Sequence, residues 1–423
     1  MLDIKFIRQN PDIVREALKR RGSSFDFEGF LEVDQERRKL LGKIEHFRAE
    51  QNKIDKEIQR LLTEKKDPKS AIEESKNIKK RIIDIEAKFN EFDVRFKRGI
   101  YRIPNIPHFS IPVGDASANK IIKKKGALKK FDFKPLDHIS LAEHLDIIDF
   151  KRAAKITKSN FVLFKNLGAK LERALINFML DLHTQDNRYC EISPPKLVSR
   201  ASMYTTGQLP NLEEDMYILK DDDLFLIPTA EVPVTNIYRD EVLKDSDLPI
   251  CYVAYTPCFR REAGSYGKDT KGLIRIHEFD KIELVKFVKP ESSYEELERL
   301  VSDACRVLDL LELPYRVVLL ATGDISFAAA KCYDIELYAP GIDKWLEVSS
   351  CSNFEDFQAR RGNIRYNDKK ENKNRYIHTL NGSGVALARL VVAILENYQQ
   401  EDKTVVIPKV LQKYLDGRKR LTK

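Results

Sequence analysis

The chain has 423 residues, of which 42% are hydrophobic and 33% charged, so it is long enough for two or three domains with sizeable cores. Its net charge of +8 arises from 74 basic and 66 acidic residues that are largely interspersed, which favours an anionic partner only weakly. No run reaches the roughly 18 apolar residues of a spanning helix, no signal peptide is recognisable, and the six cysteines form no CxxC pair. We therefore expect a cytoplasmic protein without membrane association, disulfides or structural zinc.

The first hundred residues predict a hairpin of two helices. Apolar side chains recur at heptad spacing from Val33 to Leu61 and again from Ile78 to Phe96, and Pro68 interrupts the segment between them. Two such helices joined by a short turn must pair antiparallel, and at about 1.5 Å per residue they would project about 45 Å. Arg37 and Gln51 stand at seam positions and would help to set the register.

The role of this hairpin stays open on periodicity alone. A structural or oligomerising coiled coil would show the same pattern. Residues 1–100 carry 25 basic and 20 acidic side chains, a net of +5 out of the chain's +8, which adds a slight preference for an anionic partner.

A proline-rich segment with Pro104, Pro107 and Pro112 marks a domain boundary. We expect an N-terminal domain over residues 1–103, a linker over 104–130 and a larger domain over 131–423. In the larger domain, short strands and helices alternate without regular βαβ periodicity, which predicts an α+β fold with an antiparallel sheet. An amphipathic helix around residues 171–182 precedes a strand that ends at Pro194.

Thr229 and Glu231 form a first candidate binding pair. Residues two apart on an extended segment point to the same face, so both could reach one small ligand. A strand end with an exposed glutamate is the more common meaning of such a pair taken alone.

The segment from Cys258 to Glu283 is the most informative part of the chain. It predicts two antiparallel strands joined by a polar, glycine-rich loop. An arginine can hold a phosphate, an aromatic ring can stack on a base, and a carboxylate can fix an amine, so this combination of residue types suits nucleotide chemistry. An exposed hairpin with solvated charges is the alternative for the Arg-Arg-Glu triplet by itself.

Residues 378–384 and the segment after them form a further candidate site. The glycines at 382 and 384 predict a turn that starts a helix, whose N-terminal amides could face an anion, and Arg389 would lie on that helix. The sequence contains no Walker loop, GxGxxG motif or Ser/His/Asp triad, which argues against P-loop and Rossmann folds.

Taken together, these segments resemble the seryl-tRNA synthetases, a family of class II aminoacyl-tRNA synthetases, over nearly the whole chain. The resemblance is carried by FRREAGS at 259–265, HEFDKIE at 277–283 and VSSCSNFEDFQARR at 348–361. It implies a class II antiparallel β-sheet flanked by helices, with an N-terminal antiparallel α-helical coiled-coil arm that binds tRNA. It also implies a homodimer formed through the helix near residues 171–182.

The resemblance further implies an activity. The enzyme would activate L-serine with ATP and Mg²⁺ to seryl-adenylate and transfer it to the 3′ end of tRNA(Ser), releasing AMP and diphosphate; whether tRNA(Sec) is also a substrate stays open. A ligase that loads a carrier protein would not need the arm. A non-catalytic relative would be expected to lack Arg260, Glu347 or Arg389, and all three are present.

The same resemblance implies roles for individual residues. The catalytic residues would be Arg260 and Arg389. Serine would be bound by Thr229, Ala230, Glu231, Arg260, Glu283 and Ser383. ATP would be bound by Arg260, Arg261, Glu262, Ile276, Phe279, Glu347, Val348, Ser349, Ser350 and Arg389. Mg²⁺ would be held by Glu347 and Ser350, and the loop from Ser265 to Lys271 would face the tRNA acceptor end.

Two features of this assignment can be checked against a structure. Glu347 and Ser350 lie on opposite faces of an ideal strand, so the chain must bend or bulge near Ser349 if both bind one metal. The chain also has Ser326, Ala328 and Ala388 where the family more often has glycine. We expect these departures to change loop detail without touching a position that bears a ligand.

Overall fold

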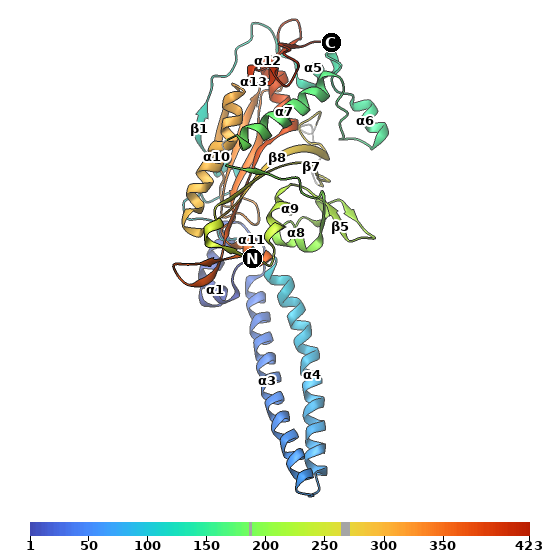
Figure 1. The fold of residues 1–423 in the computed structure, drawn as a ribbon, viewed down its shortest axis with the longest axis vertical. Helices are drawn as coiled ribbons and strands as arrows, with labels where there is room; N and C mark the ends of the chain where they lie inside the picture. The colour runs from blue at the N-terminus through green and yellow to red at the C-terminus, as the bar shows by residue number, and fades with distance from the viewer. Residues whose placement is uncertain (186–187, 264–270) are drawn as a thin grey trace.

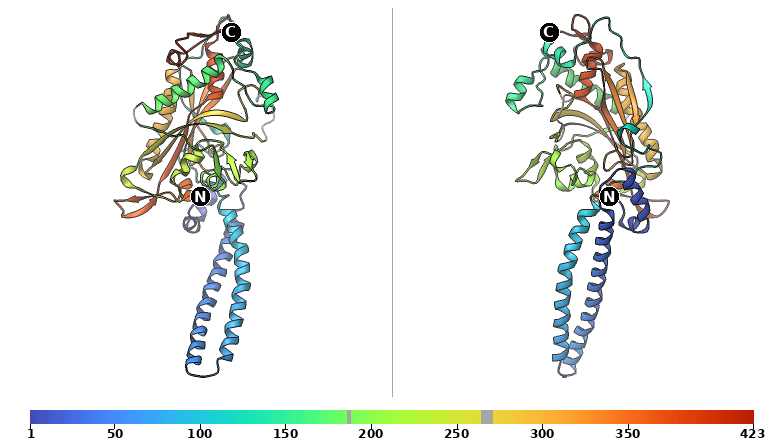
Figure 2. Two further views of the ribbon diagram at one scale, coloured as in Figure 1. Left: turned by 45° about the vertical axis from the view of Figure 1, so that its right-hand side comes forward. Right: turned by 180° about the vertical axis from the view of Figure 1, so that it is seen from behind.

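The computed structural model describes residues 1–185, 188–263 and 271–423. A long helical arm projects from a body built around one large sheet (Figure 1). Two short helices, α1 (Ile4–Gln9) and α2 (Pro11–Arg20), lie where the arm meets the body (Figure 2). Among the described residues, no helix is both long enough and apolar enough to cross a membrane.

The arm is the predicted antiparallel hairpin of two helices, α3 (Phe27–Thr63) and α4 (Lys69–Ile100). Asp26 caps α3 by accepting a hydrogen bond from the Gly29 amide, and Pro68 stands at the N-cap of α4. The predicted seam position of Arg37 is confirmed: its Nε lies 2.6 Å from Asp93 Oδ1, and its guanidinium lies 4.7 Å from the Phe96 ring centre. This pairing satisfies a cation in a largely apolar seam and helps to fix the register of the two helices.

The predicted antiparallel α+β fold is confirmed in the body. Its eight-stranded sheet is antiparallel throughout, apart from a short parallel pairing of β2 with β7. In spatial order the strands are β1 (Lys120–Lys125), β9 (Tyr315–Leu319), β10 (Lys331–Ala339), β11 (Lys344–Asn353), β14 (His378–Ala386), β8 (Glu278–Val288), β7 (Ile250–Phe259) and β2 (Cys190–Glu191).

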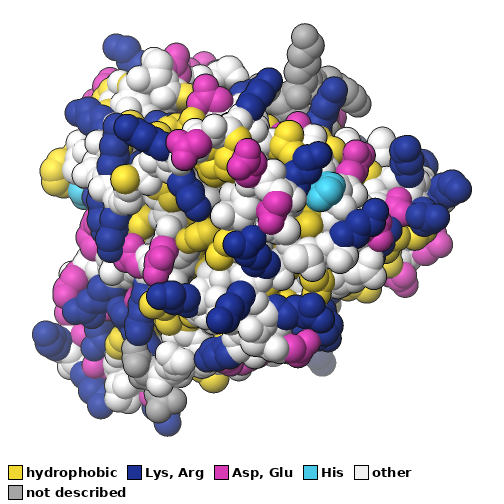
Figure 3. Space-filling view, turned by 90° about the horizontal axis from the view of Figure 1, so that it is seen from above, with side chains coloured by type: hydrophobic (Ala, Val, Ile, Leu, Met, Phe, Trp, Pro, Cys, Tyr) yellow, Lys and Arg dark blue, Asp and Glu magenta, His cyan; other side chains and the backbone are white. Residues whose placement is uncertain are grey.

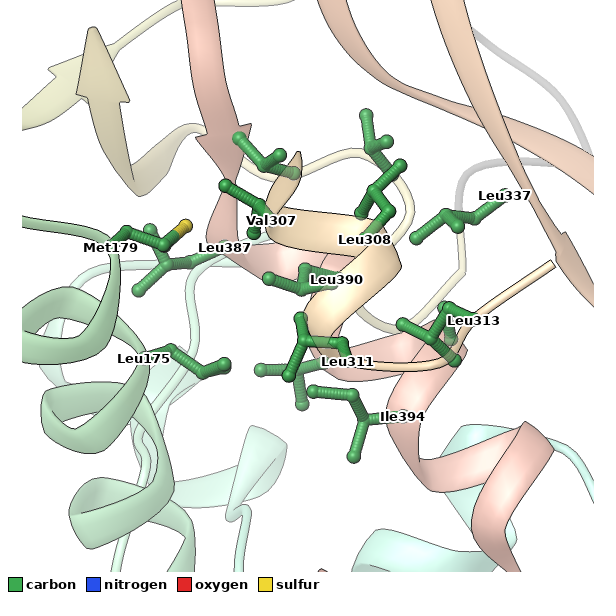
Figure 4. Close-up of a cluster of buried hydrophobic side chains, with 14 of the residues drawn as sticks. Leu175, Met179, Val307, Leu308, Leu311, Leu313, Leu337, Leu387, Leu390 and Ile394 are labelled. Atoms are coloured by element: carbon green, nitrogen blue, oxygen red, sulfur yellow. The ribbon is translucent and has the colours of Figure 1, made fainter. Parts of the chain in front are cut away.

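Three helices share the main hydrophobic core with this sheet: α7 (Leu167–Thr184), α10 (Ser293–Leu310) and α12 (Leu387–Tyr398). Figure 4 shows Leu175 and Met179 of α7 directed toward Leu387 and Leu390 of α12. All four side chains are essentially inaccessible to solvent, and full burial of each contributes about 1.5–3 kcal/mol.

Smaller elements complete the body. The helices are α5 (His138–His144), α6 (Phe150–Ile156), α8 (Arg200–Thr206), α9 (Glu231–Thr235), α11 (Phe357–Gly362) and α13 (Lys409–Gln412). The strands are β3 (Leu197–Ser199), β4 (Ile218–Leu219), β5 (Leu224–Leu226), β6 (Val242–Lys244), β12 (Arg365–Asp368), β13 (Lys373–Tyr376), β15 (Val405–Val406) and β16 (Arg420–Leu421).

One local prediction is wrong. Gly382 and Gly384 do not start a helix; they belong to β14, and α12 begins three residues after Gly384, at Leu387. A side chain at Gly382 would place its Cβ 2.7 Å from Cys351 Sγ, and one at Gly384 would lie 2.8 Å from His183 Nε2. These glycines therefore allow close packing around a central strand, rather than a turn.

The surface charge follows the composition. Seen from the end opposite the arm, basic and acidic side chains are interspersed, with the basic ones more abundant (Figure 3). This agrees with the small excess of basic residues in the sequence.

Candidate active site

A cavity of about 350 Å³ lies against strands β8, β11 and β14. Most of the residues predicted from the sequence line it: Thr229, Glu231, Arg260, Glu262, Ile276, Phe279, Glu283, Glu347, Val348, Ser350, Ser383 and Arg389. Segments far apart in the chain therefore meet in one place, which no periodic pattern could establish.

Three predicted residues do not line the cavity with their side chains. Ala230 is fully buried in a separate apolar cluster, and Arg261 is exposed. Ser349 points to the other side of β11, where its Oγ donates a hydrogen bond to the Ser383 carbonyl oxygen at 2.6 Å. For Ser349 the alternation along the strand gives the reason, because its neighbour Ser350 faces the cavity.

The predicted hairpin is formed by β7 and β8, whose register pairs Phe259 with Glu278. Arg260 follows directly after β7; its Nε donates to the Pro228 carbonyl oxygen at 3.3 Å, and its guanidinium lies 5.3 Å from the Phe279 ring centre. Within the loop, Ser265 and the residues after it up to 270 lie outside the described residues. The described part of the hairpin places a cation beside an aromatic ring, as expected for a nucleotide site.

Glu262 sits at the start of this loop in a left-handed conformation, with φ of 50°. Its carboxylate lies 3.2 Å from the Arg275 guanidinium, and both side chains line the cavity. Arg275 was not assigned a role from the sequence, because its partner stands on the opposite side of a loop whose shape the sequence does not specify.

A buried polar cluster surrounds Glu283. Its two carboxylate oxygens lie 2.5 Å from Lys281 Nζ and 3.0 Å from Asn381 Nδ2, and Lys281 Nζ also donates to Thr229 Oγ1 at 2.8 Å. Lys281 and Asn381 were missed in the sequence. The signal for Lys281 was available, because Phe279, Lys281 and Glu283 alternate along one strand and so share a face.

Glu231 lines the cavity, but the backbone around it has a different conformation from the one predicted. Ala230 is helical, with φ of −64° and ψ of −17°, and Glu231 is the first residue of α9, so the segment is not extended as expected. The turn still brings Thr229 and Glu231 to the same cavity. Burial, reinforced by the nearby charge of Glu283, raises the pKa of Glu231 to about 7.

The predicted irregularity near Ser349 is confirmed. In the pairing of β10 with β11, Ile335 lies opposite Ser349 and the next residue, Glu336, lies opposite Glu347, so Val348 is bulged. The bulge brings Glu347 and Ser350 to the same side, and both line the cavity. Without it, the two side chains would point in opposite directions.

Arg389 lies on α12 above this strand. Its Nε donates to the Ile274 carbonyl oxygen at 3.1 Å, and one terminal nitrogen donates to the Glu347 carbonyl oxygen at 2.7 Å while lying 3.6 Å from the Glu347 carboxylate. The guanidinium is thereby held at the wall of the cavity beside Glu347, one of the two candidate metal ligands.

These residues fit Mg²⁺ in one particular way. Within the described residues, no group of three or more His, Cys, Asp or Glu side chains could hold a metal ion. Mg²⁺ commonly uses one or two protein oxygens together with substrate phosphates, and Glu347 and Ser350 offer two such oxygens. The donor set therefore suits a magnesium ion that arrives with a nucleotide.

The three departures from the family pattern lie at the cavity, and whether any of them touches a ligand stays a prediction. Ser326, Ala328 and Ala388 all line the cavity. The first two belong to the segment between β9 and β10, and Ala388 directly precedes Arg389 on α12. Their added side chains therefore border the site directly.

Comparison with known proteins gives two family matches. Residues 1–107 match the seryl-tRNA synthetase N-terminal domain, and residues 216–398 match the tRNA synthetase class II core domain (G, H, P, S and T). Together these regions cover the arm and most of the residues that line the cavity.

Relatives that match over the whole chain are seryl-tRNA synthetases as well. A serine--tRNA ligase of Thermodesulfovibrio yellowstonii is 54% identical over 419 residues, covering 98% of this chain and 99% of the relative. One from Desulfitobacterium hafniense is 52% identical over 98% of this chain and 99% of its own length. The crystal structure of seryl-tRNA synthetase from Pyrococcus horikoshii complexed with ATP is 40% identical, with a TM-score of 0.91, over 100% of this chain and 99% of that one.

Proposed function

The chain belongs to the seryl-tRNA synthetases and is an ATP-dependent aminoacyl-tRNA ligase of class II, and from this we propose how its cavity activates L-serine and passes it to tRNA(Ser). One observation carries the assignment of residues. Glu231 and Glu283, which suit an amino acid with a hydroxyl, share a single cavity with Arg260, Phe279 and Arg389, which suit ATP.

The serine half of the site would use its two buried carboxylates differently. The ammonium group of serine would bind Glu231, and the hydroxyl would donate to Glu283, with Thr229 and Ser383 at the same wall. Alanine has no hydroxyl to offer to Glu283, so the polar groups around that carboxylate would be left imperfectly paired. This difference provides the discrimination between the two amino acids.

The ATP half would use Arg260 on the α-phosphate, the Phe279 ring against adenine and Glu262 at the adenine amino group. Arg389 would hold the γ-phosphate. Glu347 and Ser350 would hold Mg²⁺, which when bound neutralises phosphate charge. A planar guanidinium matches phosphate oxygens bidentately, which orients the α-phosphate for attack.

The reaction needs no protein nucleophile. The serine carboxylate, already ionised, attacks the α-phosphorus, and the bond to the diphosphate leaving group breaks to give seryl-adenylate. A ribose hydroxyl of the terminal tRNA adenosine then attacks the seryl carbonyl carbon and releases AMP. Arg260 and Arg389 would contribute by positioning the reactants and neutralising developing charge.

The rest of the proposal concerns the whole protein. Residues 1–103 would form the tRNA-binding domain, residues 104–130 the linker and residues 131–423 the catalytic domain. The enzyme would act as a cytoplasmic homodimer joined through α7. The arm would contact tRNA(Ser), and tRNA(Sec) is a second substrate to test.

ATP–diphosphate exchange across a panel of amino acids tests the activity. We expect serine to support exchange, and alanine, glycine and threonine to support at least about 100-fold less, since each lacks or misplaces a group that the site pairs. Exchange with another amino acid instead of serine would contradict the specificity. Absence of exchange from folded protein would contradict the assignment of the cavity.

A further inference from the structure

Gln358 is buried directly behind the serine side of the cavity. It belongs to α11, its side chain is completely inaccessible to solvent, and it does not line the cavity itself. Its Nε2 lies 2.6 Å from Glu231 Oε1 and 3.1 Å from the Thr206 carbonyl oxygen. Its Oε1 accepts a hydrogen bond from Thr379 Oγ1 at 2.7 Å.

The neighbours determine which way the amide points. The Thr206 carbonyl can only accept, so the group that faces it must be the NH₂ group of Gln358. The second hydrogen of the same NH₂ group then points at Glu231, and the amide oxygen is left for the Thr379 hydroxyl. Gln358 of α11 therefore faces Glu231 with a hydrogen-bond donor only.

A hydrogen-bond donor at this position stabilises the charged form of Glu231, which burial and the nearby Glu283 destabilise. Glu231 faces Glu283 and Lys281 of β8 and, after β7, Arg260; burial and Glu283 disfavour its charged form, whereas Gln358, Lys281 and Arg260 favour it. Among the favourable contacts, Gln358 is the one in direct hydrogen-bond contact with the carboxylate.

The helix that carries Gln358 is itself held in place. The Arg361 guanidinium donates to the Tyr204 carbonyl oxygen at 2.8 Å and to the Tyr101 carbonyl oxygen at 2.7 Å, and Arg360 lies 2.8 Å from Asp3. α11 is thus fixed both to the wall of the cavity and to the base of the arm. A side chain on such a support can hold its partner in one orientation.

We propose that Gln358 is a positioning residue for serine activation, which fixes Glu231 and keeps it in the ionised form that receives the ammonium group of serine. The inference rests on the proposed function, because it requires that Glu231 binds this group. Gln358 touches neither substrate; its effect reaches serine only through Glu231.

The test compares Gln358→Met with Gln399→Met in ATP–diphosphate exchange at pH values from 6 to 9. Gln399 is a matched control, because it is equally buried and hydrogen-bonded but contacts Leu136 and Glu396, away from the cavity. A thermal melt of each variant establishes that it is folded. Gln358→Glu, which keeps the shape of the side chain, provides a second variant if Gln358→Met does not fold.

In the wild type, the KM for serine should rise as the pH falls below about 7, where Glu231 takes up a proton. In Gln358→Met we expect the KM for serine at pH 7 to be about tenfold higher than in the wild type, or more. The pH below which this KM increases should be about one unit higher than in the wild type. The KM for ATP should stay within about twofold, and Gln399→Met should leave both values and the pH profile unchanged.

Folded Gln358→Met with an unchanged serine KM and pH profile would overturn the inference, as would an equal, pH-independent rise of both KM values. The proposed function has its own test within the same data. If wild-type exchange does not depend on serine, or if Glu231→Gln binds serine normally, the function assigned to Glu231 fails; if only Gln358→Met behaves as wild type, the inference fails alone.

Discussion

At the scale of residues, two buried carboxylates share one cavity but have different partners. Glu283 is paired with a lysine on its own strand, whereas Glu231 receives a neutral amide from another element. A carboxylate without a permanent cation is available for the cation that a substrate brings. The difference in partners supports our proposal that Glu231 binds the amine and Glu283 the hydroxyl.

This arrangement costs stability, and the cost can be measured. The folded protein holds the Glu231 proton with a pKa of about 7, against an ordinary value of 4.5. Between these values the folded state binds more protons than the unfolded chain, so its stability falls as the pH rises through this window. Glu231→Gln removes this loss. Above pH 7 we expect the free energy of unfolding of the variant to exceed that of the wild type by about 1–3 kcal/mol. Below pH 4.5 we expect the two free energies of unfolding to be equal.

Urea denaturation at pH 4.5 and pH 8 measures the effect, and Glu143→Gln, at an exposed position, supplies the control that should change little at either pH. The same Glu231→Gln variant should lose serine-dependent exchange. A variant that is less stable than the wild type at pH 8 would contradict this account of Glu231.

At the scale of elements, local patterns predicted helices and hairpins well and central strands less well. The seam of the arm and the β7–β8 hairpin follow from residues close in sequence. The run through Gly382 and Gly384 was misassigned, because its pairing with β8 and β11 depends on distant residues. Gln358 was missed for the same reason, since its partner Glu231 lies in another part of the chain.

Gly42 of α3 and Gly99 of α4 differ in their surroundings. A Cβ at Gly42 would meet nothing within 4 Å, whereas a Cβ at Gly99 would lie 2.7 Å from the Phe30 ring. Gly42→Ala should stabilise the arm by about 0.5–1 kcal/mol, because alanine loses less backbone entropy in a helix. Gly99→Ala should instead destabilise it by about 1–3 kcal/mol through overpacking.

Each variant is the control for the other, since the chemical change is identical. Chemical denaturation followed by circular dichroism gives both free energies of unfolding. Changes of the same sign would show that the packing of Phe30 on Gly99 does not limit this position.

At the scale of the whole molecule, the arm and the cavity are separate parts joined through a small region at the base of the arm. We expect an enzyme in which residues 40–90 are replaced by a short glycine-containing turn to keep serine-dependent exchange within about twofold. This cut retains the pairing of Arg37 with Asp93. Aminoacylation of tRNA(Ser) should be lost, because the tRNA contacts assigned to the arm are removed.

Parallel assays of exchange and of tRNA charging on the same preparation measure this outcome, and the intact enzyme is the reference. Charging that survives would make the arm a structural element. Loss of exchange together with charging would show that the arm supports the cavity itself.

The cavity is lined by segments that lie far apart in the chain, and this determines when it can form during synthesis. The arm consists of two helices adjacent in the chain, so its contacts are local and can form as soon as the first hundred residues have left the ribosome. The cavity requires β14 and Arg389, which are synthesised near the end of the chain. We therefore expect a nascent chain to present its arm long before it can bind ATP, so nucleotide binding reports that synthesis of the body is almost complete.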